Sequence, residues 1–217
     1  MTIVKICGIT NPEDARAAAD AGADILGFVF YPKSPRNVSP ERAGEIISGI
    51  RAEYSSIRVA GVFVNESLAT VRAIMQTAQL DLAQLHGQES PEMVQALQGR
   101  AYKALQARDM ASAHALMEQY CAVVNGNIPT FIADAPPAQL PGGNGLLADW
   151  SVAHEIARTF PILLAGGLNV ENVQDAIAQV QPWGVDVSSG VERAPGFKDH
   201  EKMREFIARA KNVETFR

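Results

Sequence analysis

The chain has 217 residues, of which 47% are hydrophobic, so it can form one large domain or two small ones around a sizeable core. Its formal net charge is −5, which argues against nucleic-acid binding because phosphate backbones are bound by clustered lysine and arginine. Two cysteines are too few for a disulfide framework, no apolar stretch is long enough to cross a membrane, and Lys5 interrupts the first apolar run, so we expect a cytoplasmic protein without a signal peptide.

Short runs of β-branched or apolar residues recur along the chain and are typical of strands. In chain order they are Ile3–Cys7, Ile25–Phe30, Val59–Val64, Leu82–Leu85, Tyr102–Leu105, Phe131–Ala133, Ile162–Ala165 and Val185–Val187. Segments with helical spacing follow each of them: Pro12–Ala21, Glu41–Tyr54, Leu68–Gln79, Pro91–Gln98, Asp109–Tyr120, Val152–Thr159, Val170–Val180 and Lys198–Ala210. Strands and helices are therefore predicted to alternate eight times.

Several predicted helices begin with residues that favour helix N-termini. Asn11, Ser39 and Ser90 each precede a proline, so they suit the N-cap position with proline as the first helical residue. Asn169 suits the N-cap position of the helix predicted from Val170. These residues support the predicted boundaries.

The regular alternation predicts parallel strands covered by helices. Runs such as ILGFVF and VAGVFV are apolar almost throughout, as strands buried on both faces are. A doubly wound open sheet would normally carry a glycine fingerprint after its first strand, and KICGITNPED has no GxGxxG. We therefore predict an α/β fold, a (βα)8 or TIM barrel, as a single domain over residues 1–217, with its chemistry at the C-terminal ends of the strands.

Two reactive side chains close predicted strands on opposite sides of the barrel mouth. Cys7 ends the first strand and Asp134 ends the sixth. This arrangement suits a base and an acid that flank a small substrate. Cys7 is alternatively an inert core residue, or a covalent nucleophile, although the histidine such a nucleophile usually needs would be His86, several strands away.

Polar side chains at other strand ends suit substrate binding. In the loop YPKSPRNV, Arg36 can bind a carboxylate through its planar guanidinium or simply lie in solvent. Gln84 and His86 share one face of the fourth strand, and we interpret them, like Asn65, as polar walls of a pocket, although His86 can also act as an acid or base. Asp186 faces inward on the eighth strand, where it binds a substrate hydroxyl or caps a neighbouring loop.

The loops after the last two strands are rich in small residues. Gly166 and Gly167 follow the seventh strand, and Ser188, Ser189 and Gly190 follow the eighth. Barrels often bind phosphate in these two loops through backbone N–H groups. Tight turns favour the same residue types, and that alternative stays open. Because two separate loops agree, we favour a phosphate site.

Eight motifs, each at a strand end or in the loop that follows, resemble the phosphoribosylanthranilate isomerase family. They are KICGIT, FYPKSPRNV, GVFVN, LAQLHG, FIADA, GGNG, LLAGGLNVENV and GVDVSSGVERAPGFKD, in the family's order and over essentially the whole chain. In GGNGLLADW, Asn144 and Ala148 stand where the family commonly has threonine and phenylalanine. This difference concerns a candidate lid over the substrate and not the reaction type.

The resemblance implies an aldose–ketose isomerase of tryptophan biosynthesis. Its Amadori rearrangement converts N-(5-phosphoribosyl)anthranilate into 1-(2-carboxyphenylamino)-1-deoxyribulose 5-phosphate, with Asp134 as general acid and Cys7 as general base. It also implies that Arg36 pairs with the anthranilate carboxylate and that the glycine and serine loops hold the phosphate. A free thiol titrates near ~8.5 and an aspartic acid near ~3.9, so the acid must stay protonated and the thiol must ionise, for which Lys5 is a candidate aid.

Two other barrel functions fit the sequence less well. A related barrel isomerase, acting on a phosphoribosyl-formimino substrate of histidine biosynthesis, would have an aspartate in place of Cys7 and a duplicated half-barrel. A barrel that binds a phosphorylated sugar without turnover would be expected to lose the acid or the base, and this chain keeps both. We expect no cofactor and no metal site, a small-molecule substrate as the partner, and neither nucleic acid nor membrane; the oligomeric state stays open.

Overall fold

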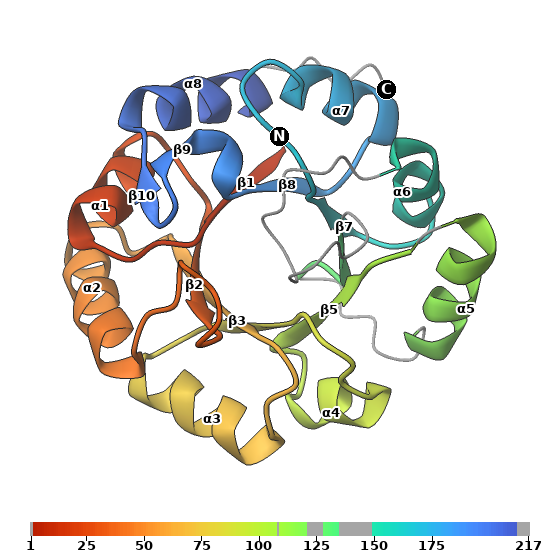
Figure 1. Cartoon of the computed structure of the whole chain (residues 1–217), viewed down its shortest axis with the longest axis horizontal. Coiled ribbons are helices and arrows are strands. Elements are labelled where there is room, and N and C mark those ends of the chain that lie inside the picture. The colour runs from red at the N-terminus through yellow and green to blue at the C-terminus, as the bar shows by residue number, and fades with distance from the viewer. Residues whose placement is uncertain (1, 108, 121–127, 135–148, 212–217) are drawn as a thin grey trace.

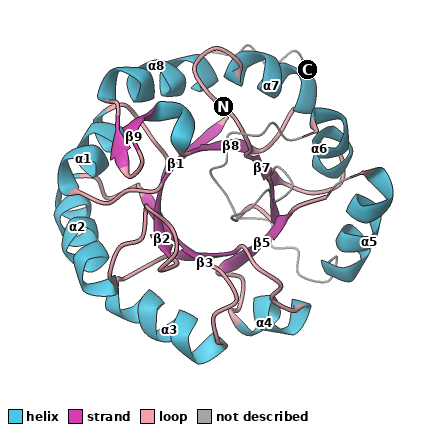
Figure 2. Ribbon diagram, viewed as in Figure 1, coloured by secondary structure: helices cyan, strands magenta, loops and turns pink. Residues whose placement is uncertain are grey.

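The computed structural model describes residues 2–107, 109–120, 128–134 and 149–211. Eight parallel strands close into a barrel in the order β1 to β8, with each strand paired to its neighbours along the chain and β8 paired to β1. The helices form a ring outside the strands (Figures 1 and 2). The predicted (βα)8 barrel is therefore confirmed, while the assignment of all 217 residues to one domain stays a prediction.

The barrel strands lie within one residue of their predicted bounds. They are β1 (Ile3–Cys7), β2 (Ile25–Phe30), β3 (Arg58–Phe63), β4 (Leu82–Leu85), β5 (Ala101–Leu105), β6 (Phe131–Ala133), β7 (Ile162–Leu164) and β8 (Gly184–Val187). The helices are α1 (Pro12–Asp20), α2 (Pro40–Glu53), α3 (Leu68–Thr77), α4 (Pro91–Ala96), α5 (Met110–Tyr120), α6 (Trp150–Ala157), α7 (Val173–Val180) and α8 (His200–Lys211).

The chain after β8 differs from the prediction. A short 3₁₀ helix, η2 (Ser189–Val191), leads into a two-stranded antiparallel hairpin of β9 (Glu192–Ala194) and β10 (Phe197–Lys198). The last helix therefore begins at His200 and not at Lys198. These short strands have the sequences ERA and FK, so they lack the apolar run that marks the equally short strands β6 and β7.

The helix N-termini confirm the predicted capping in part. The side chains of Asn11 and Ser39 accept hydrogen bonds from backbone N–H groups of the first turn, as predicted. Ser90 stands at the N-cap of α4 without a side-chain capping bond. The prediction for α7 was wrong by three residues, because Asn169 Oδ1 accepts from the N–H groups of residues 171 and 172 and so caps a turn that precedes the helix.

Alternation along the strands separates two buried layers. Outward side chains such as Val4 and Ile6 pack with the helices in the larger apolar cluster. Inward side chains such as Ile25, Tyr102 and Ile132 fill the barrel interior. After Ile3, the inward positions of β1 carry Lys5 and Cys7, so the first strand brings a charge and a thiol into the barrel.

Some predictions concern residues that the structure does not describe. Cys121 lies outside the described residues, and so do Asn144 and Ala148 of the candidate lid. Among the described residues, none of the helices combines the length and apolar character needed to span a membrane.

Candidate active site

A pocket opens at the C-terminal ends of the strands and gathers most of the predicted site residues. Its lining includes Cys7, Arg36, Gln84, His86, Asp134, Gly166, Gly167, Asp186, Ser188 and Ser189. These residues come from the ends of strands β1, β4, β6, β7 and β8 and from the loop after β2. The structure therefore brings together at one mouth side chains that lie up to 182 positions apart, from Cys7 to Ser189.

Cys7 is almost fully buried at the end of β1, with 7% of its surface exposed. It packs against Val29 and Val62 in a small apolar cluster at the mouth. Gly27 is its register partner on β2, and a Cβ atom there would lie 2.9 Å from the cysteine Sγ. Because Gly27 has no side chain, the Cys7 thiol has room at this position.

Lys5 lies below Cys7 inside the barrel and is fully buried. Its ammonium contacts Asp186 Oδ1 at 3.0 Å and Gln84 Oε1 at 2.8 Å. Burial acts to lower the pKa of Lys5, but the attraction of Asp186 and then of Cys7 outweighs it, so the pKa is raised. The barrel interior therefore holds a permanent positive charge under the thiol.

The surroundings of the Cys7 thiol act on its pKa in opposite directions. Burial raises the pKa of Cys7 above its ordinary value of 9.0, and the nearby ammonium of Lys5 lowers it by less. The expectation that Lys5 aids ionisation is correct in direction, since its ammonium lowers the thiol pKa, although desolvation of the thiolate raises that pKa by more. Burial also raises the pKa of Asp186, although Lys5 opposes that shift.

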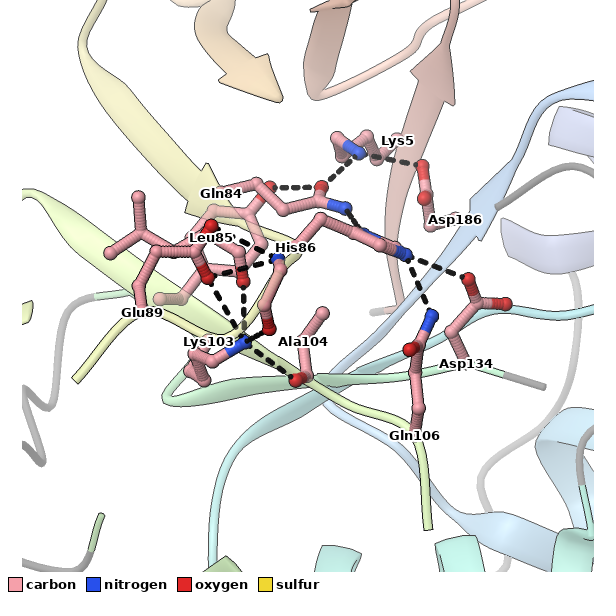
Figure 3. A network of polar contacts seen from close by, with 12 residues as sticks. Lys5, Gln84, Leu85, His86, Glu89, Lys103, Ala104, Gln106, Asp134 and Asp186 are labelled. Atoms are coloured by element: carbon pink, nitrogen blue, oxygen red, sulfur yellow. Dashed lines mark hydrogen bonds and ion pairs between the residues drawn. The ribbon is translucent and has the colours of Figure 1, made fainter. Parts of the chain in front are cut away.

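Asp134 faces the pocket from the end of β6 and contacts His86. Its Oδ2 lies 3.2 Å from His86 Nε2, and both side chains are less than 8% exposed. On the other side of the ring, His86 Nδ1 lies 2.7 Å from Gln84 Nε2. A continuous set of polar contacts thus leads from Asp186 and Lys5 to Asp134 across the pocket (Figure 3).

Arg36 lines the pocket but is already paired with a carboxylate of this chain. Its Nε and Nη2 donate to the two carboxylate oxygens of Glu192 at 2.8 and 2.7 Å, and Lys198 Nζ contacts the same carboxylate at 3.0 Å. Burial would raise the pKa of Glu192, but the two cations outweigh it and lower that pKa. The interpretation of Arg36 as a solvated side chain was wrong, since the residue is 9% exposed.

Sequence reasoning missed Glu192. Its signal was present in the motif GVERAPGFK, where an acidic residue follows the eighth strand at the end that carries the chemistry. The hairpin β9–β10 places Glu192 and Lys198 together, so these two residues reach Arg36 only through an element that the sequence pattern did not reveal.

The two small-residue loops meet at the pocket as predicted. Gly166, Gly167, Ser188 and Ser189 line it, and the buried Ser188 Oγ has no hydrogen-bond partner among the described residues. Gly190 stands apart from the lining, and a Cβ atom on it would lie 1.9 Å from the Leu168 carbonyl oxygen. Gly190 therefore lets the loop after β8 pack directly on the backbone of the loop after β7.

Asn65 does not line the pocket, so its interpretation as a pocket wall was wrong. Its Oδ1 accepts from the N–H of Gln88, and its own N–H donates to Glu89. Glu89 also contacts Lys103 Nζ at 3.2 Å, and Lys103 donates to the Gly87 carbonyl at 2.7 Å. These buried groups fix the loop that follows His86, and sequence reasoning missed Glu89 and Lys103.

The chain as a whole is similar to known proteins. The family model described as N-(5'phosphoribosyl)anthranilate (PRA) isomerase matches residues 4–209. N-(5'-phosphoribosyl)anthranilate isomerase from Geotalea uraniireducens is 48% identical over 213 residues, which cover 98% of this chain and all of the relative. The relative of the same name from Pelobacter propionicus is 46% identical, with 99% of this chain and 98% of the relative covered.

Solved structures agree with the sequence comparison. The crystal structure of phosphoribosyl anthranilate isomerase from Thermotoga maritima superposes with a TM-score of 0.87 at 38% identity, covering 98% of this chain and all of that one. The enzyme from Thermus thermophilus gives a TM-score of 0.85 at 34% identity, with the same coverage. On the matched residues and the shared barrel, this chain belongs to the N-(5'-phosphoribosyl)anthranilate isomerase family.

Proposed function

We propose that this member of the N-(5'-phosphoribosyl)anthranilate isomerase family catalyses its Amadori rearrangement in tryptophan biosynthesis with Asp134 as general acid and Cys7 as general base. The observation that carries the proposal is the shared pocket. A carboxyl group and a thiol line it together with the glycine and serine loops that suit a phosphate. A relative in the same family was solved in complex with reduced 1-(o-carboxyphenylamino)-1-deoxyribulose 5-phosphate, at a TM-score of 0.83.

The first step opens the ribose ring. Asp134 donates a proton to the furanose ring oxygen, the bond between that oxygen and C1′ breaks, and the anthranilate nitrogen forms a protonated Schiff base with C1′. The position of Asp134 supports this role, because it lines the pocket and a general acid must lie within hydrogen-bond reach of the atom that it protonates.

The second step moves a proton from carbon. The Cys7 thiolate removes the proton from C2′, the electron pair neutralises the Schiff base, and the resulting enolamine tautomerises to the ketone. Burial raises the pKa of the thiol, so ionisation of Cys7 depends on positive charge nearby. The cationic Schiff base and the buried ammonium of Lys5 both favour the charged form of the thiol at that stage.

The remaining pocket groups suit the two ends of the substrate. Arg36 keeps Nη1 outside its two bonds to Glu192, and this nitrogen can donate to the anthranilate carboxylate. Ser188 Oγ, which has no partner within the described part of the chain, suits the phosphate together with the backbone of Gly166, Gly167, Ser189 and Gly190. The cytoplasmic location stays a prediction, and the oligomeric state of this chain stays open.

A continuous fluorescence assay tests the proposal. Freshly generated N-(5-phosphoribosyl)anthranilate is mixed with the wild type, Cys7→Ala and Asp134→Asn, and the decay of substrate fluorescence is followed. We expect rapid decay with the wild type and kcat lower by about 100-fold to 10,000-fold in each variant, because each removes one general acid or base. Near-normal turnover by a variant would refute that residue's role, and a wild type that binds without turnover would favour the non-catalytic sugar-phosphate binder.

A further inference from the structure

Gln84 lies at the centre of the polar contacts beneath the pocket, between Lys5 and His86 (Figure 3). Its Oε1 accepts from Lys5 Nζ at 2.8 Å and from the Tyr102 hydroxyl at 3.1 Å. An ammonium group has donors only, so the oxygen of the Gln84 amide must face Lys5. The amide NH₂ of Gln84 is therefore directed to the opposite side.

That NH₂ group determines which nitrogen of His86 carries the proton. Gln84 Nε2 lies 2.7 Å from His86 Nδ1, and an amide NH₂ can only donate. His86 Nδ1 must then be the unprotonated acceptor, which places the proton of the neutral imidazole on Nε2.

The contacts of His86 Nε2 fit the same tautomer once the oxygen and nitrogen of the Gln106 amide are assigned. His86 Nε2 lies 3.2 Å from Asp134 Oδ2 and 3.3 Å from the Gln106 amide nitrogen. If both amides donated to the ring, neither ring nitrogen could carry a proton. Lys5 prevents Gln84 from turning over, so Gln106 must present its oxygen to Nε2–H, and the two ends of an amide are interchangeable in shape.

We propose that Lys5, acting through Gln84, fixes His86 in the Nε2–H tautomer and that His86 then donates to Asp134 Oδ2. Lys5, Gln84 and His86 are thus positioning residues for the acid, a role that rests on the proposed function of Asp134. The hydrogen bond from His86 to Oδ2 holds the carboxyl group of Asp134 at the pocket. The buried ammonium under Cys7 thereby orients the acid on the far side of the pocket.

The tautomer is directly measurable. The protein is labelled with ¹⁵N-histidine, and long-range ¹H–¹⁵N correlations are recorded without substrate at neutral pH. The chain has four histidines, so His86→Gln identifies the His86 signals by their loss. We expect the Nε2–H pattern for His86 in the wild type. A spectrum with an Nδ1–H ring or a doubly protonated ring would overturn the proposal.

Two variants test the route from Lys5. Gln84→Glu keeps an oxygen for Lys5 but replaces the donor to His86 with an acceptor, so Nδ1 should become protonated and kcat should fall, by up to about 100-fold, with KM changed less. Tyr102→Phe removes only the second donor to Gln84 Oε1, so the wild-type pattern should persist. An unchanged tautomer in Gln84→Glu, or its loss in Tyr102→Phe, would refute the assignment to Lys5.

The spectra separate this inference from the proposed function, because they require no turnover. If the tautomer is as stated while Asp134→Asn retains wild-type kcat, Asp134 is not the acid and the catalytic proposal fails alone. If Asp134→Asn loses activity while His86 adopts the other tautomer, the catalytic proposal stands and the positioning role is refuted. Gln84→Met is a second variant for the same spectra, in case Gln84→Glu fails to fold, since it removes the amide without adding a charge.

Discussion

Arginine side chains occur at both ends of the barrel, but their surroundings differ. At the N-terminal end, Arg51 pairs with Asp81 while both side chains remain 35% or more exposed, and Arg72 donates to the Ala96 carbonyl at the end of α4. At the C-terminal mouth, Arg36 and Glu192 form a bidentate pair with exposures of only 11% and 5%. Solvent screens the charges of Arg51 and Asp81, whereas the attraction between the buried Arg36 and Glu192 is screened much less.

This comparison shows that burial decides how much depends on a charged pair at either end of the barrel. Exposed pairs of the kind made by Arg51 contribute about 0 to 1 kcal/mol each, and losing one changes little. A buried pair such as Lys5 with Asp186 is different, because removal of one partner leaves a charge without solvent or counter-ion. Substitutions at the mouth should therefore have large effects, and those at the N-terminal end small ones.

Lys5→Met should have the largest effect on stability. It leaves the buried carboxylate of Asp186 without its cation, so we expect the free energy of unfolding to fall by about 3–5 kcal/mol in denaturant titrations. The double variant Lys5→Met with Asp186→Asn removes both charges and should recover part of the loss. If the single variant were as stable as the wild type, the contrast between the two ends would be broken.

Arg36→Lys should have the next largest effect, on substrate binding. Lysine cannot reproduce the planar fork, so the anthranilate carboxylate should lose a charge-assisted hydrogen bond of about 1.5–3 kcal/mol. We expect KM to rise by about 10-fold to 100-fold, with a smaller change in kcat, in steady-state assays. Arg16→Lys on the exposed face of α1 is the matched control and should leave KM unchanged. Equal effects in both variants would contradict the assigned role.

The pH dependence of Cys7 alkylation measures the effect of burial at the mouth. In a Cys121→Ser background, alkylation of Cys7 by iodoacetamide should be slower than that of free cysteine at pH 8, because burial raises the thiol pKa above 9.0. Only the thiolate reacts, so the rate should keep rising as the pH passes 9. A rate that reached its plateau below pH 8 would show an activated thiol and contradict the raised pKa.

Arg72→Ala should have the smallest effect. The side chain is exposed and donates to the last carbonyl groups of α4, so its loss should lower the free energy of unfolding by at most about 1 kcal/mol. Steady-state kcat and KM should match the wild type. A loss of activity would show that the N-terminal end of the barrel is coupled to the pocket.

Most of the barrel could be predicted from the sequence because its elements are regular. Continuous apolar runs such as ILGFVF mark strands buried on both faces, and strand ends then place Cys7 and Asp134 at one mouth without further information. The β9–β10 hairpin escaped prediction because its strands, ERA and FK, are short and carry charged residues in place of an apolar run. Glu192 was therefore not predicted as a site residue, although its two hydrogen bonds from Arg36 orient that side chain.

Contacts between polar side chains were harder to predict than positions. Alternation along β4 predicts that Gln84 and His86 share a face, but not that the amide of one contacts the ring of the other or that Lys5 orients that amide. The net shift of the Cys7 pKa was likewise missed, since it depends on burial from several strands while the sequence shows only the nearest cation.

Loops usually vary most among related proteins, since substitutions there disturb little packing. The loops after β7 and β8 leave no such room at one position, because Gly190 brings their backbones so close that even one methyl group would meet the Leu168 carbonyl oxygen. The two loops are thus packed as one unit, so an engineer who grafts one of them into another barrel should transfer both.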